Sequence, residues 1–89
     1  MAEIVFAKAF RRHVDCPDAT VSGGDVGAAL ADYFEQHPTV RGYVLDDVGA
    51  LRKHVALFVD NDLIADRATL TDSVGEQSTI HVFQALSGG

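Results

Sequence analysis

Apolar side chains recur at every second position in several short stretches of this chain, which is the period of a β-strand with one buried face. In the last such stretch Ile80 and Val82 share one face, while His81 and Phe83 share the other. This stretch carries no Pro or Gly, so a central place in a small sheet suits it. The predicted strands are residues 4–7, 19–22, 52–59, 63–64 and 79–85.

A helical period appears in residues 25–37, where Val26, Leu30 and Phe34 recur every four residues. Asp25 suits the amino-terminal end of this helix, and Pro38 ends it. A further helical turn is predicted in residues 8–14, whereas residues 40–45 are expected to lead into a turn at 46–49. The order of elements predicts an α+β fold, in which a mostly antiparallel sheet packs on one helix.

Length and charge narrow the class of protein. The 89 residues fit one small domain, and a formal net charge of −6 argues against a nucleic-acid binder, which would normally be basic. That charge fits a protein that meets a basic partner surface. Neither a membrane span nor a secretory signal is predicted, and the single cysteine, Cys16, precludes an internal disulfide, so we expect a cytoplasmic protein.

Several segments resemble redox, calcium-binding or phosphate-binding motifs, but each lacks residues that the motif requires. Cys16 has no second cysteine in a CxxC pair, so we interpret it as an ordinary buried or half-buried thiol. Residues 60–66 lack the Gly and the terminal Glu of a calcium loop, and residues 23–27 lack the fingerprint of a phosphate loop, so they are interpreted as a helix start. No histidine has a metal-ligand partner at useful spacing, and we expect neither a metal site nor catalytic residues. The basic run 11–13 is interpreted as a solvated face, with a partner contact as the alternative.

The sequence ends in Gly88 and Gly89, which have no side chain to bury and lose much backbone entropy on ordering. Two interpretations are open for these glycines. They form a frayed terminus, or the carboxylate of Gly89 is the working group and the glycines let it pass through a narrow enzyme channel.

The element order, with a last apolar strand that leads into two glycines, resembles the ubiquitin-like β-grasp fold. Residues 69–72, 78–83 and 88–89 are similar to the end of ubiquitin, although Gln84 and Ser87 stand where ubiquitin has arginines. Residues 40–46, 51–59 and 84–89 resemble the bacterial MoaD/ThiS sulfur-carrier family, and this likeness covers nearly the whole chain. The resemblance implies a mixed four- to five-stranded sheet packed on one main helix in residues 1–85, and a flexible tail in residues 86–89.

The same resemblance implies a function in which the chain is a substrate of enzymes and not an enzyme itself. A MoeB/ThiF-like partner uses ATP to adenylate the carboxylate of Gly89, and a sulfur donor converts it to a thiocarboxylate. An acceptor enzyme of cofactor, amino-acid or metabolite biosynthesis then takes the sulfur. No permanently bound cofactor is implied.

Three alternatives remain open at this stage. The chain is a ubiquitin-like modifier conjugated through Gly89, the small subunit of molybdopterin synthase, or a β-grasp interaction module with an inert tail.

A docking face follows from the strand alternation. If the helix covers the face of Leu57 and Ile80, then Phe58, His81 and Phe83 lie on the open face, where exposed aromatic side chains mark an interface. We therefore predict that these three residues, together with Leu86, bind partners. The alternative is that the amino-terminal segment or a second copy of the chain covers the rings.

Overall fold

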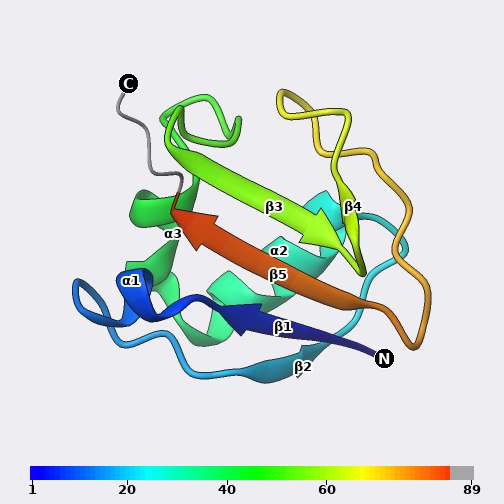
Figure 1. Ribbon diagram of the computed structural model, residues 1–89, viewed down its shortest axis with the longest axis horizontal. Helices are drawn as coiled ribbons and strands as arrows, with labels where there is room; N and C mark the ends of the chain where they lie inside the picture. The colour runs from blue at the N-terminus through cyan, green and yellow to red at the C-terminus, as the bar shows by residue number, and fades with distance from the viewer. Residues whose placement is uncertain (85–89) are drawn as a thin grey trace.

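The computed structural model describes residues 1–84 of the 89, so the domain boundary at residue 85 and the tail at 86–89 lie outside the described residues. The described part is an α+β domain with three helices and five strands (Figure 1). Its elements are β1 (Ala2–Phe6), α1 (Lys8–Arg11), β2 (Ala19–Val21), α2 (Val26–Gln36), α3 (Pro38–Val44), β3 (Val55–Val59), β4 (Asp62–Leu63) and β5 (Thr79–Gln84).

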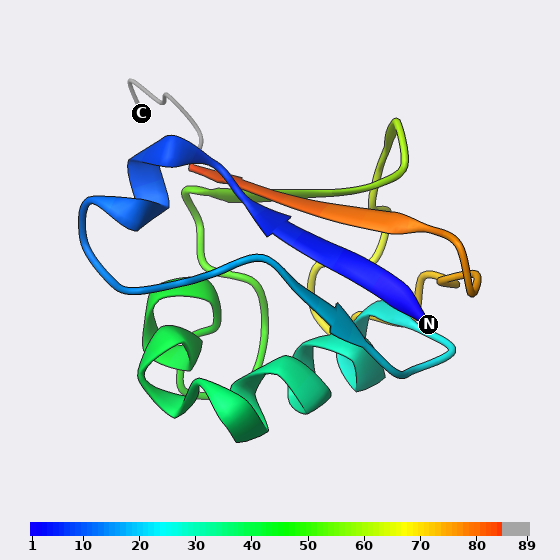
Figure 2. The ribbon, with the colours of Figure 1, turned by 90° about the horizontal axis from the view of Figure 1, so that it is seen from below.

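The five strands form one mixed sheet in the order β2-β1-β5-β3-β4. β5 is central: it pairs in parallel with β1 and antiparallel with β3, while the hairpin pairs β1–β2 and β3–β4 are antiparallel. Figure 2 shows α2 and α3 together below the sheet. The predicted mixed sheet and the central position of its last strand are confirmed.

The core lies between the sheet and these two helices. Because strand side chains alternate between faces, every second residue of β1, β3 and β5 points toward α2. Ile4, Leu57, Ile80 and Val82 have no exposed surface, and Tyr33 of α2 is 1% exposed beneath them. The predicted apolar stripe of the helix is therefore the stripe that the sheet covers.

One helix was not predicted. Residues 40–45 were expected to lead into a turn, but α3 occupies Pro38–Val44 and buries Val40 and Val44. Pro38 ends α2, as predicted, yet it also begins α3, since a proline at the first helical position lacks only an N–H that would have no helical partner. The prediction failed because the same proline signals both a stop and a start.

The long strand is shorter than predicted. Residues 52–59 were assigned to it, but β3 begins at Val55. The N–H of Arg52 donates to the carbonyl of Val44 at 2.9 Å, and that of Val55 donates to the carbonyl of Arg52 at 3.0 Å. These hydrogen bonds hold residues 52–54 in a turn, so they are not available for the sheet.

Candidate functional site

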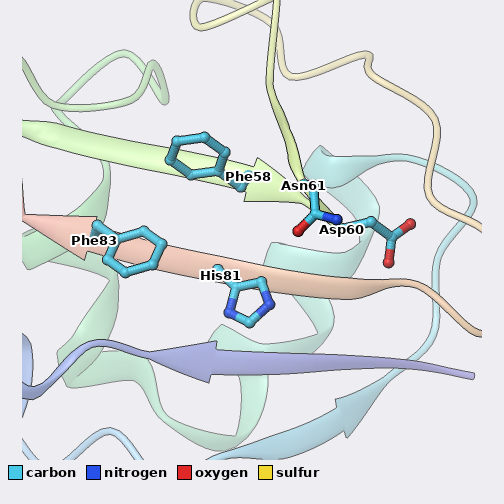
Figure 3. Close-up of a pocket in the computed structure, with 5 residues that line it drawn as sticks. All are labelled: Phe58, Asp60, Asn61, His81 and Phe83. Carbon is cyan, nitrogen blue, oxygen red and sulfur yellow. The ribbon is translucent and has the colours of Figure 1, made fainter.

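The structure brings together three of the six residues that were predicted to form the site. Phe58, His81 and Phe83 lie side by side on the face of the sheet opposite the helices, and we call them the aromatic patch (Figure 3). Leu86, Gly88 and Gly89 lie outside the described residues.

Strand register places the aromatic patch. Phe58 of β3 is directly opposite His81 of β5, and Phe83 is opposite Ala56. The rings of Phe58 and Phe83 therefore meet diagonally, with centroids 5.6 Å apart and planes at 89°. The imidazole of His81 is nearly parallel to the ring of Phe83 at a centroid distance of 6.1 Å and an angle of 20°. The three rings support one another, although Phe83 remains 41% exposed.

The aromatic patch borders a shallow pocket of about 420 Å³, completed by Asp60 and Asn61. These two polar residues come from the β3–β4 turn, where Asp60 adopts a left-handed φ of 57°. The carboxylate of Asp60 accepts a hydrogen bond from the N–H of Thr79 at 3.0 Å, which ties the turn to the start of β5. An apolar floor with a polar end is the composition expected of a protein-docking surface.

Two apolar neighbours of the patch were missed by the sequence interpretation. Leu63 of β4 pairs with Phe58 and is 59% exposed, and Val5 of β1 pairs with His81 and is half-buried. Val5, His81, Phe58 and Leu63 thus form one row across four strands. The available signal was the two-residue loop Asp60–Asn61, because its length sets the register that puts Leu63 opposite Phe58.

The amino-terminal segment does not cover the patch, which removes one alternative. Residues from Ala2 onward form β1 inside the sheet, paired with β5 through Glu3, Ile4, Val5 and Phe6.

The suspected phosphate loop is a helix start, as interpreted. Asp25 caps α2 by accepting a hydrogen bond from the N–H of Ala28 at 2.8 Å. The N–H groups of Val26 and Gly27 donate to the carbonyls of Asp72 and Leu70. Since the first amides of the helix already have partners, they are not available to a phosphate.

The other rejected sites are also explained by local contacts. The carboxylate of Asp66, part of the suspected calcium loop, accepts hydrogen bonds from the hydroxyls of Thr69 and Thr71. Those hydrogen bonds hold the pKa of Asp66 well below its usual range. Within residues 1–84 no group of three or more His, Cys, Asp or Glu side chains could hold a metal ion. Cys16 is buried, and burial raises the pKa of its thiol.

No helix of the described residues is long and apolar enough to cross a membrane.

The chain matches no protein-family model and no curated protein. It does resemble solved structures over almost its whole length. SAMP1 from Haloferax volcanii has a TM-score of 0.76 at 22% identity, over 99% of this chain and 98% of that one. CysO from Mycobacterium tuberculosis, described as an antigen, has a TM-score of 0.81 at 16% identity, over 97% of this chain and 100% of that one. A chain of the Amycolatopsis orientalis BexX/CysO complex has a TM-score of 0.83 at 16% identity, over 100% of both chains.

These likenesses concern the fold, since the identities are low. The strand order, the parallel β1–β5 pair at the centre and the full-length agreement with SAMP1 and CysO show that this chain has the predicted ubiquitin-like β-grasp fold.

Proposed function

We propose that this protein is a sulfur carrier whose working group is the carboxylate of Gly89. A free carboxylate is a poor electrophile, so it must first be activated. The carboxylate oxygen attacks the α-phosphorus of ATP in a MoeB/ThiF-like enzyme, which gives an acyl-adenylate and releases pyrophosphate. Sulfide then attacks the acyl carbon and AMP leaves. If the donor is a persulfide, its outer sulfur attacks instead and forms an acyl disulfide, which a second thiol of the donor enzyme cleaves while it forms a disulfide with the donor sulfur. The product is a thiocarboxylate, which delivers sulfur to an acceptor enzyme.

The observation that carries this proposal is the likeness of the fold to that of CysO, with a TM-score of 0.81 over 97% of this chain and 100% of that one. The central strand β5 ends at Gln84, five residues before Gly89. Five residues reach at most about 18 Å when fully extended. That reach is enough for Gly89 to enter a partner's active site while the folded domain stays outside, which gives a tethered group a high effective concentration there.

The aromatic patch supplies the docking surface in this proposal. Phe58 and Phe83 present apolar rings beside the imidazole of His81 on an open sheet face, and exposed Leu63 extends that surface to the edge strand. Aromatic side chains at the centre of an interface commonly carry much of its binding energy. We assign this face to an apolar surface of the adenylating enzyme. One solved neighbour is a complex of BexX with CysO, which supports partner binding by this fold.

A reconstituted reaction tests the chemistry. The protein is incubated with a MoeB/ThiF-type enzyme from its own genome, ATP and sulfide, and its intact mass is measured. We expect a gain equal to the replacement of one oxygen by one sulfur, which disappears when ATP is omitted or Gly89 is deleted. Sulfur incorporation into the Gly89 deletion would contradict the proposal.

A second candidate is a protein modifier joined through Gly89 to lysine side chains. The likeness to proteins named small archaeal modifier protein 1 favours it. Adducts of higher mass on a denaturing gel, absent for the Gly89 deletion, would support conjugation.

A further inference from the structure

A second surface, distinct from the aromatic patch, lies at the end of the sheet where β5 finishes. It contains a pocket of about 290 Å³ that Gln84, the last described residue, helps to line. Basic and hydroxyl side chains dominate its polar part, and no carboxylate side chain of residues 1–84 lines it. Its lining includes His13, Tyr43, Arg52, His54 and Gln84.

The topology brings these distant segments together (Figure 1). β1 runs parallel to β5, so α1, which follows β1, lies at the same end as Gln84. β3 runs antiparallel to β5 and Val55 pairs with Gln84, so residues 52–54 lie at that end as well. We call Arg12, His13, Arg52, Lys53 and His54 the basic end.

The positive charge at the basic end is not neutralised by contacts within residues 1–84. Arg52 donates through Nε to the carbonyl of Gly42 at 2.6 Å. Arg67 donates to the carbonyls of Arg52 and Val55 at 2.6 and 2.8 Å, which adds a further cation at the start of β3. Carbonyl acceptors orient these guanidinium groups without cancelling their charge. The ion pair recorded in residues 1–84 joins Arg11 to Asp18.

The acidic side chains are distributed differently. Glu3, Asp60, Asp62 and Glu76 lie at or next to the opposite end of the sheet, where β5 begins. Near the basic end, Asp15 and Asp18 lie in the segment that follows α1, where Asp18 pairs with Arg11, and Asp46 and Asp47 border Arg52 in a separate pocket. A chain with a net charge of −6 therefore presents cations around the point from which residues 85–89 continue.

We propose that the basic end docks against an acidic protein surface that surrounds the opening of the active site receiving Gly89. This inference rests on the proposed function, and it deepens it by naming the chemistry of the partner's surface. Any enzyme that takes Gly89 inside must come close to Gln84, and thus to the basic end. The net charge of −6 alone favours a partner with a basic surface. The cations of the basic end instead favour an acidic surface at this place. An acidic protein suits these cations better than nucleic acid, which the overall charge of −6 repels.

Association kinetics with the MoeB/ThiF-type enzyme test this proposal. Lys53→Glu reverses one exposed charge of the basic end, and Arg41→Glu makes the same change on α3 beside a different pocket, near Glu35. We expect Lys53→Glu to slow association about three- to tenfold at low salt and much less at about 300 mM salt, because salt screens steering. Arg41→Glu should change the rate less than about twofold. Equal effects of the two variants, or faster association of Lys53→Glu, would overturn the proposal.

A second measurement is independent of sulfur transfer. Hexaglutamate is titrated into the isotope-labelled protein at constant ionic strength, and backbone amide shifts are followed. We expect the shifts to concentrate at His13, Tyr43, Lys53 and His54. Shifts spread evenly over the surface, or a stronger response to inorganic phosphate or to single-stranded RNA, would overturn the assignment of an acidic protein partner. Failure of sulfur incorporation alone would instead contradict the proposed function.

Discussion

Phe58 and Phe83 meet edge to face across two neighbouring antiparallel strands, with ring centroids 5.6 Å apart and planes at 89°. Diagonal pairs of this kind stabilise a sheet by about 0.5–1.5 kcal/mol beyond the area that they bury. The pair nevertheless leaves Phe83 41% exposed on the face opposite the helices. Its geometry is therefore compatible with two roles, support of the β3–β5 pairing and contact with a partner.

These two roles separate in the variant Phe83→Asp. Since Phe83 is outside the core, we expect the free energy of unfolding to fall by no more than about 1.5 kcal/mol. Partner affinity should fall at least about tenfold, as for an aromatic residue at the centre of an interface. Urea unfolding and binding to the adenylating enzyme measure the two effects.

Val48→Ser is the control for this prediction, because it removes an apolar side chain without adding a charge beside Arg52. Val48 is 85% exposed and lines a pocket separate from that of the aromatic patch. We expect it to change neither quantity appreciably. An equal loss of affinity in both variants would remove the patch from the interface.

Gly23 is the backbone position at which a side chain is least tolerated among the described glycines. Its φ is +150°, and an added Cβ would lie 2.6 Å from the amide nitrogen of Ala29 and 2.8 Å from the carbonyl carbon of Ala28. Because these are backbone atoms at the start of α2, they cannot move aside easily. We expect Gly23→Ala to lower the free energy of unfolding by about 2 kcal/mol or more.

The neighbouring Gly24→Ala variant is its control, since no atom of the described residues lies within 4 Å of a Cβ there. It should be neutral, or stabilise the fold by up to about 1 kcal/mol through the unfolded state. Thermal or urea unfolding of both variants gives the comparison, and similar losses at the two positions would contradict it.

Asp66 makes stability depend on pH. Hydrogen bonds from Thr69 and Thr71 lower the pKa of its carboxyl in the folded state. A lowered folded pKa stabilises the native state above the unfolded pKa of about 3.9, and this contribution declines as pH falls below that value. We expect the urea midpoint of the wild type to fall on acidification from about pH 5 to about pH 2.5, and the advantage over Asp66→Asn to shrink over the same range.

The double variant Thr69→Val/Thr71→Val is the comparison for this titration, because it removes both hydroxyl donors and keeps the carboxylate of Asp66. The advantage of the wild type over this variant should shrink over the same range of pH. A difference between the wild type and Asp66→Asn that stays constant with pH would show that the threonine hydroxyls do not perturb this group.

The long strands β1, β3 and β5 were predictable from sequence because buried and less buried positions alternate along them, although β3 begins later than predicted. In β5 the alternation predicted both the strand and its open face. The structure confirms it, because Ile80 and Val82 are buried while Phe83 is exposed. α3 was not predictable in this way, because Pro38 is a valid stop for one helix and a valid start for the next, and the helix has only seven residues. Short helices of this kind are decided by tertiary burial, here of Val40 and Val44, more than by local preference.

The aromatic patch was partly predictable for the same reason. Alternation alone puts Phe58 and Phe83 on one face, but it does not say that Leu63 joins them, because that depends on the register of a two-residue strand. The sequence showed only one part of the basic end, the run 11–13, which was interpreted as a solvated face with a partner contact as the alternative. His13 and His54 are far apart along the chain, and only the parallel β1–β5 pairing and the antiparallel β3–β5 pairing bring them to one pocket.

Intact mass spectrometry of the protein isolated from its own cells tests the role of Gly89 most directly. A sulfur carrier should appear partly as a species in which one oxygen is replaced by one sulfur, and this species should react with a thiol-alkylating reagent at the carboxyl end. The Gly89 deletion, expressed in the same cells and folded equally well, should lack it. A chain found only as the free carboxylate with an unimpaired deletion strain, or only as lysine-linked adducts, would contradict sulfur transfer through Gly89.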